Sequence, residues 1–419
     1  MRSNSERLSP EASVPSREVP YGWVVIFASL AIHTVGLGAP TILYVALKPI
    51  AADLGTLRAV PSLAYSLLMI GAGIGGIAMG WWMDRRGVMQ PVLFGSVMIG
   101  VGAIVASHSN GEWSLYLANG LLIGLLGKSA MIAPLIANAT RWFDRRRGLA
   151  VAVIASGQGI AGALWPPIIR FVSDGYGWRG TFFYYGILAL VTMVPLAVLL
   201  RAPRHHPDGD VGTAAADGRG RVAGLHPKTV QAMLWLAVVG CCGGMSMPIV
   251  HLVSYGTDLG MSTTHAANAL SILFAAAFIS RLGFGMLSDR IGAMKTLLIG
   301  SASQTAMLIV FSFIETSTGL YVAAALFGFG FAGIMPCYSL IIRLMFPESQ
   351  AGWRIASQYL FASSGMAFGG WLGGVVFDVS GGYSAAFLVG AALGVLNFAL
   401  VGTLKLRHAA ARTPQAAPA

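Results

Sequence analysis

The sequence predicts an all-α integral membrane protein with twelve transmembrane helices, arranged as two pseudo-symmetric six-helix bundles. Three observations predict this fold class. Of the 419 residues, 56% are hydrophobic and only 10% are charged, too few charged side chains to cover a soluble protein of this length. Twelve apolar runs are each long enough to cross a bilayer as a helix. Similar motifs recur in the two halves of the chain at one nearly constant offset, which indicates a duplicated unit.

Charged or turn-rich segments separate the twelve apolar runs. In chain order the runs are 22–47, 60–82, 89–108, 113–140, 148–171, 181–200, 229–256, 266–288, 294–314, 319–342, 355–377 and 384–404. No A-x-A-like cleavage site is found with the first run, so we expect the polar start of the chain to be a tail and not a cleaved signal. The predicted parts are a cytoplasmic N-terminal tail at 1–20, a bundle at 21–200, a central cytoplasmic loop at 201–228, a second bundle at 229–406 and a cytoplasmic C-terminal tail at 407–419.

Three pairs of motifs relate the two halves. The turns after the second and eighth runs both read Gly, three residues, Asp, Arg, one residue, Gly, and they start at Gly80 and Gly285, an offset of 205. The fifth and eleventh runs both end near an Asp, at an offset of 204. A Gly followed by an aromatic residue comes next, again at an offset of 205. These last pairs are Asp174 with Asp378 and Gly177 with Gly382.

Lysine and arginine are distributed unequally between the two sides of the predicted membrane. The side of both termini carries 21 of them, and the other side carries three, which are Lys48, Arg58 and Arg179. Because positively charged loops stay in the cytoplasm, we expect both termini and the central loop to be cytoplasmic, in a bacterial inner (plasma) membrane. Orientation then explains the net charge of +11, and no nucleic-acid partner is needed.

These features resemble the major facilitator superfamily over residues 21–406 and imply its fold. A sharper likeness follows the fourth run, where the segment from Trp142 to Ala150, WFDRRRGLA, resembles a signature of the monocarboxylate transporter family. The segment from His251 to Gly260 is similar to the end of helix 7 in bacterial members. Arg281 stands where that family has its helix 8 arginine. The bacterial oxalate–formate exchangers are also similar.

The resemblance implies a secondary active transporter of a small organic anion, in particular proton-coupled monocarboxylate symport by alternating access. Thr41 and Ala277 stand where animal members have a Lys and an Asp, so their proton relay cannot be transferred to this chain. Carboxylate exchange or dicarboxylate uptake stays open, and so does a non-transporting membrane sensor of carboxylates. The expected partners are a small carboxylate, protons and the lipid bilayer.

Two charged residues fall well inside predicted spans, away from their ends, where charge is costly and usually functional. Lys128 is roughly 20 Å from either end of its predicted helix. Arg281 is nearer the cytoplasmic end of its helix and can hold a carboxylate through two parallel hydrogen bonds. We expect both to bind substrate, with Tyr255 and Phe331 as further substrate-binding residues.

Asp258 and His33 are the candidates for proton coupling. Asp258 ends a polar helix face, and a carboxylate that pairs with Arg281 in one state only would bind and release a proton during the cycle. An unperturbed histidine titrates near neutral pH, which makes His33 the second candidate.

Charged residues on the cytoplasmic rim are expected to form a gate between helices, with positive-inside topology as the alternative explanation. The glycine-rich segment at 71–76 fits G-x-G-x-x-G but lies inside a predicted helix, so a dinucleotide site is rejected. The sequence contains no Walker motif, metal-ligand cluster or nucleophile elbow, so we expect no enzyme activity, cofactor or metal. The gate residues are Asp84, Arg85, Arg86, Asp289 and Arg290.

Overall fold

The structure is a computed structural model that describes residues 20–131, 133–143, 147–200, 222, 224–346 and 348–412. Within these residues it consists of helices and turns, and its only extended feature is an isolated bridge between Val222 and Leu225. The all-α prediction is therefore confirmed. Most of the predicted tails and of the central loop lie outside the described residues, as does part of the basic segment after Trp142.

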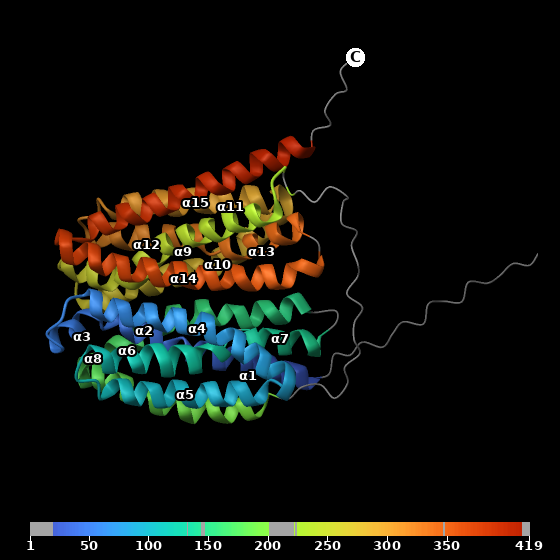
Figure 1. Cartoon of the computed structure of the whole chain (residues 1–419). Coiled ribbons are helices and arrows are strands. Elements are labelled where there is room, and N and C mark those ends of the chain that lie inside the picture. Colours follow the sequence, from blue (N-terminus) through green and yellow to red (C-terminus); the bar gives the residue numbers. More distant parts are fainter. Residues whose placement is uncertain are drawn as a thin grey trace, which may run out of the picture.

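The helices form two groups that lie side by side in Figure 1. We call α1 to α8 the N half and α9 to α15 the C half. The N half contains α1 (Pro20–Gly36), α2 (Gly38–Val45), α3 (Leu47–Asp53), α4 (Ala59–Arg86), α5 (Met89–Ser107), α6 (Glu112–Tyr116), η1 (Leu117–Gly127), η2 (Lys128–Ala130), α7 (Ala133–Trp142) and α8 (Arg147–Val198). The C half contains α9 (Pro227–Asp258), α10 (Thr263–Ile291), α11 (Ala293–Phe311), α12 (Ser317–Phe331), α13 (Ile334–Met345), α14 (Glu348–Ser380) and α15 (Tyr383–Arg412).

Eleven helical segments of the described chain are long and apolar enough to cross a membrane, against the twelve that the sequence predicts. Ten match predicted runs one to one, and the segment 153–198 covers two runs. Its 46 residues would extend roughly 70 Å as one straight helix, more than twice the thickness of a bilayer core. Gly177, at φ 68°, breaks α8 inside this segment. Glycine adopts this backbone conformation without the steric cost that a Cβ would bring.

The duplicated turn motif has the same geometry in both halves. Gly87 ends α4 at φ 79°, and its N–H donates to the carbonyl of Met83. Gly292 ends α10 at φ 86°, and its N–H donates to the carbonyl of Ser288. A glycine at positive φ after the last helical residue is a common helix stop. The motif therefore sets where the two helices end.

The fourth predicted run is irregular near its middle. It starts as α6, continues as the π-helix η1, and tightens into the 3-10 turn η2, which begins at Lys128. The tenth run is also interrupted, because α12 ends at Phe331 and α13 starts at Ile334. The offset of 205 places Lys128 opposite Gly333 in this second break. Such irregular backbone inside a membrane occurs where it is buried in protein or lines a cavity, and π segments are frequent at functional sites.

Glycines hold η1 close to α4. An added Cβ on Gly71 would lie 2.5 Å from the carbonyl oxygen of Gly120, and one on Gly75 would lie 2.1 Å from that of Leu125. Small residues at this spacing let helix backbones approach closely. Gly80, one helical turn and a half further along α4, would place no Cβ within 4 Å of another atom.

Two helix pairs make the main contact between the halves, α4 with α14 and α8 with α10. On the first pair, Ser66 Oγ donates to the carbonyl of Ala367 at 2.6 Å. We call the end of the molecule where α3 lies the distal end, and the end where α1 begins and α15 stops the proximal end (Figure 1). Toward the proximal end, Gly80 on α4 and Gly285 on α10 face open space.

We predict that Gly75→Ala destabilises the protein, because the new Cβ would overlap backbone that cannot move away cheaply. Overpacking of this kind costs about 1–3 kcal/mol. Gly80→Ala on the same helix is the matched control, and it should be neutral or stabilising by up to about 1 kcal/mol, since alanine favours the helix. Thermal unfolding of the two purified variants in detergent measures the difference. Equal unfolding temperatures would show that α4 and η1 are not closely packed.

Candidate functional site

Lys128 lies at the start of η2, near the middle of the helical run that begins with α6. Its side chain is partly exposed, and no hydrogen bond or ion pair joins it to any residue in the described ranges. A lysine this far from both helix ends cannot extend its ammonium to the membrane surface. The ammonium therefore needs water or an anion at this level of the protein.

Arg281 reaches from α10 across the boundary between the halves to α8. Its Nη1 donates to the carbonyl of Ala155 and its Nη2 to Gln158 Oε1, each at 3.1 Å. Its Nε is buried without a hydrogen-bond partner. Both acceptors are neutral, so the guanidinium charge is not balanced by a carboxylate of the described chain.

His33 of α1 lies against the same turn of α8. Its side chain is buried, and its Nδ1 has no hydrogen-bond partner. Its Cδ2 would lie 3.0 Å from a Cβ added to Gly157, which stands between the two α8 residues that hold Arg281. Three residues further along α1, a Cβ added to Gly36 would lie 3.3 Å from Met131 Cγ, and the N–H of Met131 donates to the carbonyl of Lys128 at 3.0 Å. His33, Lys128 and Arg281, from α1, η2 and α10, form what we call the central site.

Acidic residues lie away from the central site. Every Asp or Glu among the described residues is in a turn or within three residues of a helix end or of the break at Gly177. Uncompensated charge inside a protein is costly. The central site therefore favours a negatively charged occupant.

A second charged cluster joins the two halves at the distal end. Asp258 of the C half accepts hydrogen bonds from Lys48 Nζ at 2.6 Å and from Arg58 Nη1 at 2.7 Å, both in the N half. Lys48 Nζ also donates to Thr257 Oγ1 at 2.5 Å. The Asp258 side chain is 32% exposed, so water screens these ion pairs only in part. We call Lys48, Arg58 and Asp258 the distal latch.

Other residues of the C half fix Arg58 in the latch. Its guanidinium lies 3.8 Å from the ring centre of Phe377, and its Nη1 donates to Tyr383 Oη at 3.2 Å. Asp378 accepts from the N–H groups of Arg58 at 3.3 Å and Ala59 at 2.9 Å, which caps the start of α4. Although burial alone would lower the pKa of Arg58, its hydrogen bonds raise that pKa above its ordinary value, so the group stays charged.

The equivalent acid of the N half has a different partner. Asp53 precedes Asp258 by the repeat offset of 205. Arg179 forms an ion pair with Asp53, and Trp178 Nε1 donates to the Asp53 carboxylate at 3.3 Å. All three of these residues belong to the N half. The acid at this position of the repeat therefore pairs within its own half when it is Asp53, and with the opposite half when it is Asp258.

The structure does not form the predicted pair between Asp258 and Arg281. Asp258 ends α9 at the distal end, whereas Arg281 is 18 residues into the following helix, roughly 27 Å along its axis. Asp258 pairs with Lys48 and Arg58 instead. The predicted pairing of Asp258 with Arg281 is therefore not formed in this structure, and their exchange during a transport cycle stays a prediction.

Two predicted pocket residues make packing contacts. The Tyr255 hydroxyl lies 2.9 Å from the carbonyl oxygen of Phe311 and 2.7 Å from that of Ile314, so it ties α9 to the end of α11. Phe331 is buried, and its ring centre is 5.3 Å from that of Phe327 on the same helix. These contacts explain both residues as core, and neither is tied by them to the central site.

Part of the predicted cytoplasmic gate lies outside what the structure describes, because the side chains of Asp84 and Asp289 are not included. Arg86 and Arg290 are exposed, and the guanidinium of Arg85 lies 3.6 Å from the ring centre of Trp81. The gate remains a proposal.

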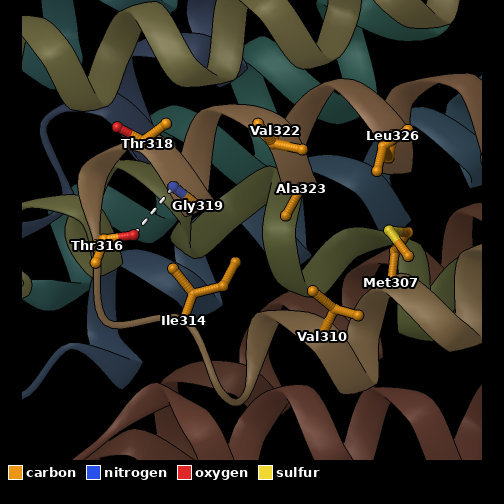
Figure 2. A pocket seen from close by; sticks show the side chains of 9 residues that line it. All are labelled: Met307, Val310, Ile314, Thr316, Thr318, Gly319, Val322, Ala323 and Leu326. Atoms are coloured by element: carbon orange, nitrogen blue, oxygen red, sulfur yellow. Dashed lines mark hydrogen bonds between the residues drawn. The ribbon is translucent and has the colours of Figure 1, made fainter.

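A groove of about 450 Å³ lies between α11 and α12, as Figure 2 shows. It is almost wholly apolar, and Thr316 Oγ1 in it accepts from the N–H of Gly319 to cap α12. None of the central-site residues lines it. An apolar groove offers an anion no counter-charge, so we place the candidate site at Lys128 and Arg281. The lining residues are Met307, Val310, Ile314, Thr316, Thr318, Gly319, Val322, Ala323 and Leu326.

Sequence reasoning did not assign Lys48, Arg58 or Gln158 a role. Lys48 and Arg58 are two of only three basic residues on the side of the membrane away from the termini, and this rarity is the signal that could have found them. Gln158 gives no such signal, because its role depends on which face of α8 meets α10.

Comparison with known proteins shows the family of this chain. The sequence profile described as Major Facilitator Superfamily matches residues 26–314 and 232–418. Monocarboxylate transporter 13 of Rattus norvegicus is 28% identical over 310 residues, which are 74% of this chain and 71% of that protein. Monocarboxylate transporter 11 of Mus musculus is 26% identical over 386 residues, 88% of this chain and 84% of that protein.

Solved structures share the fold. The nucleoside transporter NupG superposes with a TM-score of 0.69 at 14% identity, covering 92% of this chain and 99% of the other. The peptide transporter POT in complex with sulfate superposes with a TM-score of 0.71 at 14% identity, covering 93% and 95%. The chain therefore belongs to the Major Facilitator Superfamily and is a membrane transporter of that family, not an enzyme.

Proposed function

We propose that the protein is a secondary active transporter of a small organic anion, whose negative charge is held between Lys128 and Arg281. The observation that carries this proposal is that both cations lie inside the membrane-spanning part without an acidic partner in the described chain. One comes from each half. An occupant between them would therefore contact both halves, as alternating access requires.

A monocarboxylate is the first candidate substrate. Relatives named monocarboxylate transporters match over most of this chain, and Arg281 presents two parallel N–H groups suited to one carboxylate. The second candidate is a dicarboxylate, taken up or exchanged, because Lys128 offers a second positive charge. The alternative of a carboxylate sensor predicts binding without movement across the membrane.

The proposed topology has twelve crossings in two six-helix bundles. The broken helix α8 supplies two crossings, and the eleven apolar segments then make twelve. Both termini are proposed to be cytoplasmic in a bacterial inner membrane, so the distal end faces outward. The gate at Arg85, Arg86 and Arg290 would then lie on the cytoplasmic side, with Asp84 and Asp289.

We propose that the distal latch is the outer gate. It ties the halves together at the outer end, while Gly80 and Gly285 near the inner end face open space. This arrangement is that of an inward-open transporter. Protonation of Asp258 from outside would remove its charge and favour opening of the latch, so Asp258 and His33 are both candidates for coupling transport to protons.

We predict that Arg281→Ala abolishes transport in a folded protein. Losing the charged hydrogen-bond partner should weaken anion binding by about 2–5 kcal/mol. Arg281→Lys should also bind poorly, because one ammonium cannot make both parallel bonds. Uptake of labelled L-lactate and malonate into liposomes measures transport, and Arg343→Ala at an exposed site is the matched control. Normal uptake by Arg281→Ala would refute the site, and binding without uptake by the unaltered protein would favour the sensor.

We predict that Lys128→Gln separates the two candidate substrates. If Lys128 binds a second carboxylate, the loss of malonate affinity in the variant should exceed its loss of lactate affinity by tenfold or more, roughly 1.4 kcal/mol. Competition binding with both anions measures this, with Lys295→Gln at an exposed position as the control. Equal loss for both anions together with lower thermal stability would instead show a structural lysine.

We predict that Asp258→Asn opens the distal end. Loss of two partly exposed ion pairs should shift the equilibrium toward the open state by about 1–2 kcal/mol, roughly 5- to 30-fold. Spin labels on exposed Leu57 and Val379 report the separation of the halves. Asp53→Asn is the control, because Asp53 pairs within one half, and it should leave the distance unchanged. If both variants behave alike, the latch is not a gate.

A further inference from the structure

We infer that His33 carries the transported proton, and that an anion bound between Lys128 and Arg281 is what allows His33 to take it up. This inference rests on the proposed function of the central site. His33 would couple the proton to the anion, and the arrangement of His33, Lys128 and Arg281 gives the physical reason.

The position of His33 is fixed by the packing of α1 on α8. The imidazole lies against Gly157, and Ala155 and Gln158 of the same turn of α8 accept hydrogen bonds from Arg281. Two further bonds anchor α1 here. Trp165 Nε1 donates to the carbonyl of Thr34 at 2.8 Å, and the Tyr185 hydroxyl donates to that of Val35 at 2.8 Å.

The Nδ1 atom of His33 is a nitrogen that could accept a proton. It is buried and has no hydrogen-bond partner. Burying a polar atom in this way is costly unless another state of the protein uses it. His251, in the packing between α9 and α14, also has a buried Nδ1 without a partner, and its Nε2 is bonded to the carbonyl of Gly370 at 2.8 Å. What distinguishes His33 is its place against the turn of α8 that holds Arg281.

Lys128 and Arg281 are the two cations that the packing links to His33, through Met131 and through the turn of α8 around Gly157. Helix α1 packs against α2, α5, α7 and α8. Helix α5 has no titratable residue, and the side chains of Arg141 on α7 and Arg147 on α8 lie outside the described residues. Tyrosines stay neutral near pH 7. The other ionisable groups are Tyr21 on α1 itself, Tyr44 on α2, Arg170, Asp174, Tyr176, Arg179, Tyr184 and Tyr185 on α8, Lys128 on η2 and Arg281 on α10.

An anion at the central site changes the electrostatic repulsion that a protonated His33 would meet. In the empty site an imidazolium would be a third positive charge beside Lys128 and Arg281, and like charges disfavour the charged form. A bound anion cancels much of that repulsion, so the imidazole takes a proton from water on the open side. When the anion leaves on the other side, the proton returns to water there. Binding of each then strengthens binding of the other, as linkage requires.

Asp258 is not placed to couple in this way. It lies at the distal end, roughly 27 Å along α10 from the level of Arg281, and its partners are Lys48 and Arg58. Its protonation would open or close the latch without responding to an anion at the central site.

The test is the number of protons taken up when L-lactate binds to the purified protein. Lactate is ionised between about pH 6 and pH 8, so any proton taken up is bound by the protein. Calorimetric titration in two buffers of different ionisation enthalpy measures this number. We expect close to one proton per lactate at the upper end of this range, and an affinity that rises up to tenfold for each unit of falling pH. In His33→Gln the uptake should fall to near zero and the affinity should no longer depend on pH.

Controls separate this inference from its alternatives. His265→Gln, the same change at an exposed histidine, and Asp258→Asn should both keep proton uptake. If His33→Gln does not fold, Lys128→Gln tests the same electrostatics. Because one cation is lost, His33 should hold its proton before lactate binds. Proton uptake at saturating lactate should therefore fall at least by half. Unchanged uptake in either variant, or its loss in Asp258→Asn alone, overturns the inference. Lactate binding without proton uptake in the unaltered protein overturns the inference but not the proposed function. Failure to bind either lactate or malonate removes both.

Discussion

Two positive charges inside the membrane, one in each half and neither paired with an acid of the described chain, are the constraint on which the rest of the structure depends. Arg281 is accommodated by neutral acceptors on α8, and Lys128 stands at a break in its helix. In the proposed function, a guanidinium that holds the opposite half while the site is empty exchanges those bonds for an anion when the site fills. Substrate binding and the contact between α8 and α10 therefore compete for the same N–H groups.

The distal latch answers a different requirement, which is to hold the halves together at one end only. Its ion pairs are partly exposed and individually weak, but Asp378 and the rings of Phe377 and Tyr383 fix Arg58 in place. The repeat makes the asymmetry clear. Asp53 could have formed a second latch by symmetry, but the residues at the offset positions of Lys48 and Arg58 are Val253 and Thr263, which carry no charge. In the proposed function, this one cluster of two ion pairs closes the outer end and opens during the cycle.

The sequence predicted the spans well because hydropathy is a local property, and it located Lys128 and Arg281 because a charge in an apolar run is visible without a structure. It missed the partners of Asp258 because they lie about 200 residues away, and only the packing of the halves brings them together. Tyr255 was assigned to a pocket from its helix face, but periodicity does not say which neighbour that face meets, and here it meets α11. The interruption at η1 was not expected, since its Leu- and Gly-rich sequence also fits a regular transmembrane helix.

The π-helix η1 affects how this chain can be compared with its relatives. Each π turn holds about one residue more than an α turn, so the direction in which Lys128 points is set by the number of residues between Leu117 and Gly127. A relative with a regular α-helix here would place a different residue at the same point in space. Within this helix, residues that align in sequence therefore need not occupy the same place in the structure. A lysine matched to Lys128 by counting residues is its functional counterpart only in proteins that share the same irregular turn.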